Sequence, residues 1–305
     1  MRNKFADVIY KIGKKDNRIC AIVADISPAG SMINFREEFP DRFINCGVAE
    51  QSMIGIAAGL ALKGMRPFCY TIATFSIYRP FEMIRVDLCY QNLPVTVIGM
   101  GAGVIYSTLG GTHHTMEDIA VASAIPNMTV IAPCDPIEME LATEWCATKS
   151  SGPVYMRLGK AGEPNLTNNA IDEFVIGKIR YLKKGKKIAI LSYGITVSMA
   201  FDLEKRFAEI NENVSVICIH TIKPLDKKNI SKILMEYEKV VILEEHVPHG
   251  GLSSKVKEIA IDCGNNAKIY SYTLQDQFIH FYGSHKELLS RHGLDVDKIF
   301  EDLKG

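Results

Sequence analysis

The sequence RFINCGVAEQSMIGIAAGLA, at residues 42–61, places one carboxylate, Glu50, in a stretch that is otherwise mostly small and apolar. A carboxylate is rarely fully buried unless a partner group binds it. Glu50 therefore either caps a helix, where the helix dipole favours a negative charge, or receives a bound partner. Small residues from Gly55 to Gly59 leave room for a neighbouring backbone or a flat ring. On this stretch alone, capping is the simpler interpretation.

Around this stretch, short β-branched runs alternate with longer amphipathic segments. Strands are predicted at 19–24, 66–71, 95–100, 128–132 and 153–157, and helices at 51–63, 80–90, 115–124 and 135–149. Asp135 is expected to cap the last of these helices, with Pro136 at its first position. This βαβα order predicts an α/β fold with a parallel sheet covered by helices.

A chain of 305 residues favours two domains. Residues 161–185 are rich in glycine, asparagine and lysine, and we expect a linker with little capacity to form a core. Further strands are predicted at 188–194, 214–219 and 239–243, with a helix at 250–260. We therefore expect a parallel-sheet domain at 1–160, the linker, and a smaller α/β domain at 186–305.

The composition excludes several classes of protein. Lys plus Arg equals Asp plus Glu, at 35 each, so nothing indicates a nucleic-acid or anionic membrane surface as partner. Neither a membrane-spanning run nor a signal-peptide core is visible in the sequence. The eight cysteines form no C-x-x-C pair, and several lie in strand-like runs. This usage is typical of small buried side chains in a reducing cytoplasm, not of a disulfide framework or zinc site.

Three aromatic residues, Phe75, Tyr78 and Phe81, recur every three residues. Aromatic residues at this spacing usually belong to a core, but they also suit a shelf on which a heteroaromatic ring stacks. Pro80 indicates a loop that runs into the start of a helix, which favours the site.

Two histidines, His113 and His114, follow a glycine pair in a loop after a predicted strand. A metal site ranks low because only two carboxylates lie near them in the sequence. Histidines at the carboxyl end of a strand suit proton transfer or a hydrogen bond to a substrate oxygen; a surface pair is the alternative. Arg157, at the end of a later strand, suits either a phosphate or carboxylate ligand or an ordinary ion pair.

In their order and spacing, these segments resemble the transketolase family of thiamine-diphosphate enzymes, over essentially the whole chain. Residues 46–51 resemble the segment that carries the family's cofactor-activating glutamate, 74–81 its aromatic pocket and 111–113 its active-site histidine loop. Residues 243–251 and 283–294 resemble its C-terminal domain. The resemblance implies a pyrimidine-binding domain followed by the family's C-terminal domain.

The resemblance also implies roles for particular residues. Glu50 would bind N1′ of the aminopyrimidine and promote the imino tautomer that deprotonates the thiazolium, so that the cofactor serves as an electron sink. Phe75 or Tyr78 would stack on the pyrimidine, and Phe81 would complete the apolar wall. The remaining expected contacts are those of Asp25 with the cofactor, of His113 and His114 with substrate oxygens, and of Arg157 with a substrate phosphate.

Family members bind the diphosphate through Mg²⁺ with a Gly-Asp-Gly motif and a downstream asparagine, and this chain has no such motif. We therefore expect a split enzyme. This chain would be the C-terminal subunit of an α2β2 heterotetramer, and the Mg²⁺ ligands would lie on an N-terminal partner subunit.

Three departures from the family bear on the substrate. Leu109 stands where transketolases place a hydroxyl-reading aspartate, Ala29 where a serine contacts phosphate, and Gly101 where a substrate histidine is expected. We expect two-carbon ketol transfer with a non-standard sugar, such as a deoxy, branched or nucleotide-linked one, because an unpaired polar substrate group is costly. The alternatives are a 2-oxo acid dehydrogenase beta subunit, a deoxyxylulose-phosphate-synthase-like carboligase, and a non-catalytic scaffold subunit.

Overall fold

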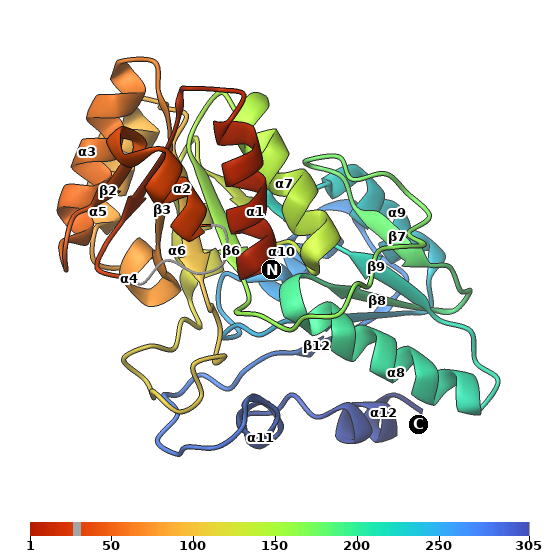
Figure 1. Cartoon of the computed structure of the whole chain (residues 1–305). Coiled ribbons are helices and arrows are strands. Elements are labelled where there is room, and N and C mark those ends of the chain that lie inside the picture. The colour runs from red at the N-terminus through yellow and green to blue at the C-terminus, as the bar shows by residue number, and fades with distance from the viewer. Residues whose placement is uncertain (27–31, 305) are drawn as a thin grey trace.

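The computed structural model of the protein describes residues 1–26 and 32–304, which fold around two β-sheets (Figure 1). The strands are β1 Ile19–Val23, β2 Phe43–Asn45, β3 Arg66–Ile72, β4 Thr96–Met100, β5 Thr129–Ile131, β6 Val154–Leu158, β7 Arg180–Lys183, β8 Ile188–Ser192, β9 Ser215–Cys218, β10 Thr221–Lys223, β11 Lys239–Leu243 and β12 Lys268–Tyr272. The α-helices are α1 Arg2–Gly13, α2 Met32–Glu38, α3 Glu50–Leu62, α4 Ala73–Ile77, α5 Phe81–Met83, α6 Asp118–Ala124, α7 Pro136–Thr148, α8 Val197–Glu209, α9 Lys227–Glu236, α10 Leu252–Cys263, α11 His285–Arg291 and α12 Val296–Lys304. A π-helix at Ile84–Tyr90 continues α5, and short 3₁₀ turns lie at Pro40–Arg42 and Gly194–Thr196.

The first sheet has the strand order β10-β5-β6-β4-β3-β1-β2. Its strands from β1 to β6 pair in parallel, as the alternation of strands and helices predicted. Successive side chains of a strand point to opposite faces, so each strand contributes side chains to two cores. Ala21 and Val23 pack with one core, and Ile22 packs with the other.

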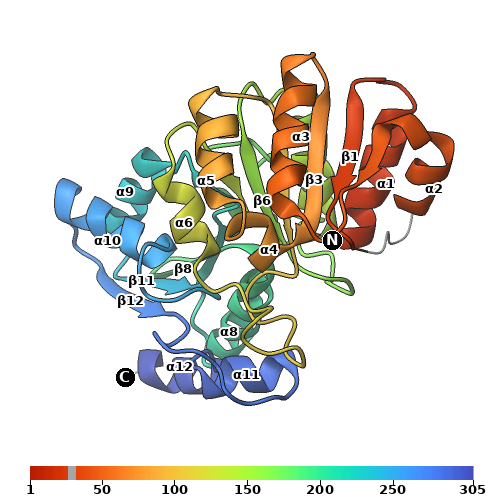
Figure 2. The ribbon, with the colours of Figure 1, turned by 90° about the vertical axis from the view of Figure 1, so that its left-hand side faces the viewer.

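Helices cover both faces of this sheet. Helices α1 and α7 pack against each other on one face, and they lie side by side in Figure 1. Helices α3 and α6 and the π-helix cover the other face (Figure 2). Both faces are apolar and enclosed, which explains why the strands are continuous hydrophobic runs instead of alternating ones.

The second sheet has the order β12-β11-β8-β9-β7. Helices α8 and α12 pack together on one face, and α9 and α10 pack together on the other. Helix α11 lies beside α12 at the end of the molecule that carries the C-terminus (Figure 2).

Two strand pairings join the two sheets and the predicted linker more closely than the sequence indicated. Strand β10 follows the second sheet's β9 but pairs antiparallel with β5 of the first sheet. Strand β7 lies within the segment expected to be a linker, and it pairs antiparallel with β9. Thr167 and Leu182 of that segment are buried, so part of it belongs to the packed fold.

The ends of several helices follow local chemistry. The Asp135 carboxylate accepts a hydrogen bond from the Glu138 N–H at 2.8 Å and caps α7, as predicted. Helix α6 begins at Asp118, three residues later than expected. Helix α10 begins at Leu252, where the buried Glu244 carboxylate accepts the N–H groups of Leu252 and Ser253. Within the described residues, the structure has no helix long and apolar enough to cross a membrane.

Candidate active site

The candidate site lies at the carboxyl ends of the parallel strands, where ligands bind in open α/β sheets. Glu50 is the first residue of α3, just after β2. The Asn45 side chain accepts the Gly47 N–H at 3.0 Å, and Gly47 adopts φ +68°, a value that favours glycine. This turn starts α3 at Glu50, so the carboxylate stands at the positive end of the helix dipole. Its side chain is only 4% exposed.

Arg79 provides the partner of the buried Glu50 carboxylate. Its Nη1 donates to both carboxylate oxygens at 3.0 Å. The guanidinium carbon lies 4.1 Å from the ring centroid of Phe75, in cation–π geometry. The Arg79 side chain remains 45% exposed. Glu50 is therefore neither a solvated helix cap nor an unpaired buried charge.

The three aromatic residues each make different contacts. Phe75 lies inside the short helix α4 instead of in a loop, and Arg79 and His113 both contact its ring. The Tyr78 hydroxyl donates to Glu117 Oε2 at 2.7 Å. Phe81 begins α5 and packs against the core. Helix α4 ends at Ile77, so Phe75 and Phe81 belong to different helices. The Phe75 ring lies against Arg79, the partner of Glu50.

The two histidines lie in different environments, His113 beside Phe75 and His114 in the interior. The His113 ring meets Phe75 edge-on at a centroid distance of 5.3 Å, and the Thr112 hydroxyl lies 3.0 Å from its Nδ1. His114 is only 5% exposed, and burial lowers the pKa of its imidazole. His113 therefore faces the candidate site, whereas His114 is a largely neutral interior residue at pH 7.

Asp25 lies at the end of β1, exposed, with a left-handed backbone at φ +46°. Its N–H donates to the same Asn45 side chain that shapes the turn before Glu50. The Asn45 side chain thereby links the Asp25 backbone to the turn that precedes α3. Ala29, expected at a phosphate contact, lies outside the described residues.

Arg157 forms the ion pair that was the alternative to a phosphate contact. Its Nε donates to Asp118 Oδ2 at 2.9 Å and its Nη2 to the Glu245 carbonyl at 2.9 Å. Its side chain is only 4% exposed, and the Asp118 side chain is fully buried. The guanidinium thus holds α6 and the second domain against β6.

Three residues that hold the site's ion pairs and loop in place were not predicted from the sequence. Arg79, Asp118 and Glu245 each stand next to a residue that a motif singled out, but their partners are far away in the sequence. Glu245 Oε1 accepts the Val104 N–H at 2.6 Å and lies 2.9 Å from His285 Nε2, so it fixes the loop after β4. A buried charge within a motif was the available signal, because such a charge requires a partner.

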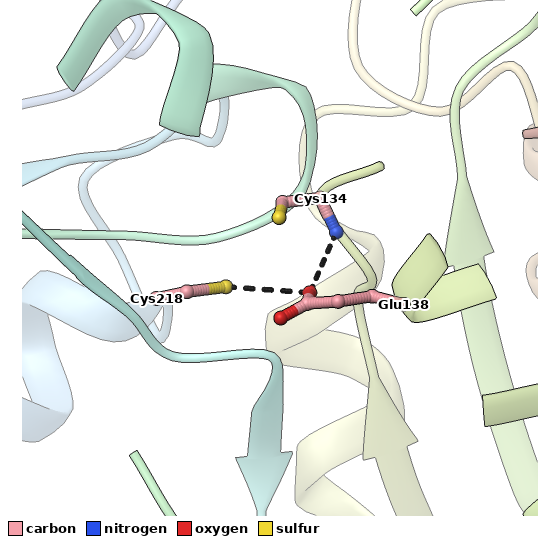
Figure 3. Close-up of side chains that lie close together, drawn as sticks. All are labelled: Cys134, Glu138 and Cys218. Carbon is pink, nitrogen blue, oxygen red and sulfur yellow. Dashed lines mark hydrogen bonds between the residues drawn. The ribbon is translucent and has the colours of Figure 1, made fainter. Parts of the chain in front are cut away.

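A second buried cluster lies where the two sheets meet. Cys134, Glu138 and Cys218 have ligand-type atoms within 4.8 Å of one another (Figure 3). Glu138 Oε2 accepts the Cys134 N–H at 3.0 Å and the Cys218 thiol at 3.5 Å. Its other oxygen accepts from Arg180 at 3.1 Å. Burial raises the pKa of the Cys218 thiol to about 12. Neutral thiols around an ion-paired carboxylate are typical of a structural link between domains.

The described residues suit one half of a thiamine site. A buried carboxylate and an adjacent aromatic face match the polar edge and flat surface of an aminopyrimidine. The chain's half of the site is thus the pyrimidine end, since the sequence carries no diphosphate motif.

Comparison with protein families supports this assignment. Residues 1–163 match the transketolase pyrimidine-binding domain, and residues 177–299 match the transketolase C-terminal domain. The chain belongs to the transketolase family. Thiamine-diphosphate dependence and transferase activity, expected from the motifs, follow from this membership.

Relatives of this transketolase-family chain include single subunits. It is 32% identical to one of the subunits of the apulose-4-phosphate transketolase of Phocaeicola vulgatus, over 98% of this chain and 94% of the relative. It is 33% identical to the 1-deoxy-D-xylulose-5-phosphate synthase of Clostridium perfringens, over 98% of this chain but 48% of that enzyme. A solved structure described as a split gene transketolase, inactive beta4 tetramer, has a TM-score of 0.87 at 30% identity, over 99% of this chain and 96% of that one.

Proposed function

We propose that this transketolase subunit uses Glu50 to activate thiamine diphosphate for two-carbon ketol transfer from a ketose to an aldose. The buried Glu50 carboxylate, placed at the sheet edge beside Phe75, carries the proposal. The cofactor supplies the carbanion-stabilising chemistry once it is bound.

The chain's own residues would divide the work. The Glu50 carboxyl group would hydrogen-bond N1′ of the aminopyrimidine, favour a proton at that nitrogen and hold the ring's orientation. Phe75 provides the face on which the ring lies. His113, whose ring meets Phe75 edge-on, would hydrogen-bond a substrate oxygen and transfer a proton. Asp25, at the neighbouring strand end, is the proposed further contact of the cofactor. The Tyr78 ring is the alternative stacking face, and its hydroxyl donates to Glu117 at the start of α6.

A partner subunit would complete the site with the diphosphate domain and the Mg²⁺ ligands. Helix α3 supports this proposal, because beyond its first turn it is apolar on every side although one side faces solvent. An all-round apolar helix is typical of one that is covered on every side. Val48, just before Glu50, is 70% exposed, and Ile56 and Leu62 are also exposed. We propose that the N-terminal subunit covers this face, in a cytoplasmic α2β2 heterotetramer.

The loop after β4 supports a non-standard sugar. Gly101 adopts φ +68°, and a Cβ there would lie 2.3 Å from the Tyr106 ring. Tyr106 thus occupies the space of any side chain at 101, including the histidine expected in transketolases. Leu109 stands where transketolases place a hydroxyl-reading aspartate. Its side chain is 47% exposed and offers no hydrogen bond to a sugar. Apulose 4-phosphate, which gives the Phocaeicola vulgatus relative its name, is a candidate of the proposed kind.

The rival function is that of a deoxyxylulose-phosphate-synthase-like carboligase, which one relative's name favours. A reconstituted enzyme, with its partner subunit, Mg²⁺ and thiamine diphosphate, distinguishes the two. We expect ketol transfer from at least one branched or deoxy ketose phosphate, and no CO₂ from pyruvate. Release of CO₂ would support the carboligase. Efficient transfer between xylulose 5-phosphate and ribose 5-phosphate would contradict the non-standard sugar.

A further inference from the structure

The contact between Arg79 and Glu50 differs from an ordinary surface ion pair. Exposed pairs contribute little because both charges stay hydrated. Here the carboxylate is nearly inaccessible, and one guanidinium nitrogen holds both of its oxygens at 3.0 Å. Removal of the partner from a buried charge is costly. The chain therefore supplies the counter-charge for the Glu50 carboxylate from its own sequence.

The same guanidinium lies on the Phe75 ring, at 4.1 Å from the centroid. Arg79 therefore occupies the two surfaces that the proposed function assigns to the aminopyrimidine, namely the carboxylate oxygens of Glu50 and the face of Phe75. A ring nitrogen cannot approach the oxygens along the line of Nη1 while the guanidinium is there. The two arrangements exclude each other.

Arg79 is also placed so that it can leave. It lies between α4 and α5, next to Pro80, and 45% of its side chain is exposed. Rotation about its side-chain bonds would move the charge into water without a change in the core. The carboxylate has no such freedom, because it is buried at the start of α3.

We propose that Arg79 is a placeholder for the aminopyrimidine: it pairs with Glu50 in the empty half-site and is displaced when the cofactor binds. This inference rests on the proposed role of Glu50. Arg79 is a positioning residue, which pairs with the Glu50 carboxylate and holds it in place before the cofactor arrives. Because the pair must break first, it reduces the apparent affinity for the cofactor.

The test measures the dissociation constant of thiamine diphosphate, with Mg²⁺, by titration calorimetry on the complete enzyme. In Arg79→Gln no ion pair has to break, so we expect the Kd to fall at least fivefold. Arg79→Lys keeps a competing charge and should stay within about twofold of wild type. Arg85→Gln, which removes an exposed arginine of the following π-helix, is the matched control and should leave the Kd unchanged. An unchanged or higher Kd in Arg79→Gln would overturn the placeholder.

A second arm shows whether the effect passes through Glu50. In a Glu50→Gln background, which has no charge to release, Arg79→Gln should change the Kd by less than twofold. The same tightening in both backgrounds would overturn the placeholder and leave the proposed function intact. A wild-type enzyme that binds no thiamine diphosphate would overturn the proposed function and the placeholder with it.

Discussion

Arg180 Nη1 donates to Glu138 Oε1 at 3.1 Å, and both side chains are buried where the two sheets meet. Arg180 comes from β7 in the segment between the domains, and Glu138 from α7 of the first domain. The pair therefore binds the segment that the sequence predicted to be a linker directly to the first domain.

Replacement of Arg180 by methionine should destabilise the protein strongly. It would leave the Glu138 carboxylate buried without a counter-charge, at a cost of about 3–5 kcal/mol. Urea unfolding followed by circular dichroism measures this loss. The double variant with Glu138→Gln should recover much of it, because the glutamine oxygen still accepts the Cys134 N–H. Arg206→Met, which breaks surface pairs with Glu209 and Asp297, should cost about 1 kcal/mol at most. Equal effects of Arg180→Met and Arg206→Met would contradict the structural link.

Replacement of Ile56 by aspartate should prevent assembly with the partner subunit. The variant places a charge on the exposed apolar side of α3, where a partner would have to bury it. Co-purification and size-exclusion chromatography with the N-terminal subunit measure assembly. Ile261→Asp is the matched control, because Ile261 is 83% exposed on α10 in the second domain. Normal assembly of Ile56→Asp would place the interface elsewhere.

The contact between His285 and Glu245 should make stability depend on pH. Burial lowers the pKa of His285, but the charge and hydrogen bond of Glu245 outweigh it, and the pKa is raised from 6.5. A raised histidine pKa stabilises the fold fully below the unfolded pKa, and this contribution is lost as the pH rises through the folded pKa. The stability difference between wild type and His285→Gln should therefore be largest below pH 6.5 and shrink above it. Urea midpoints from pH 5.5 to 8.5 measure this difference. A difference that grows with pH would contradict the pair.

Replacement of His113 by asparagine should lower kcat about a hundredfold or more, the usual contribution of a proton-transfer group. The fold should survive, since His113 is only partly buried. Steady-state kinetics on the reconstituted enzyme measure the loss, and circular dichroism checks the fold. His114→Asn should act mainly on stability, because its ring is buried. Greater loss of kcat in a well-folded His114→Asn than in His113→Asn would reverse the assignment of the two histidines.

The sequence predicted those features that depend on local patterns. The strand runs, the Asp135 cap and the placement of Glu50 at a helix start all follow from residues close together in the chain. The β7 and β10 pairings could not be predicted in this way, because each is a short strand whose partner is fixed by tertiary packing. The site followed the same division. Residue types predicted Phe75 and His113 as candidates, but the Glu50–Arg79 pair spans 29 positions and depends on how α4 turns the chain.

The central claim is that Glu50 activates thiamine diphosphate, and hydrogen exchange at C2 of the bound cofactor tests it directly. The exchange is followed by NMR in deuterated buffer on the complete enzyme, with cofactor binding confirmed by calorimetry. Glu50→Gln should bind the cofactor but slow the C2 exchange at least about a hundredfold, because a glutamine cannot take part in the proton transfer. An unchanged exchange rate in a variant that still binds the cofactor would contradict the account.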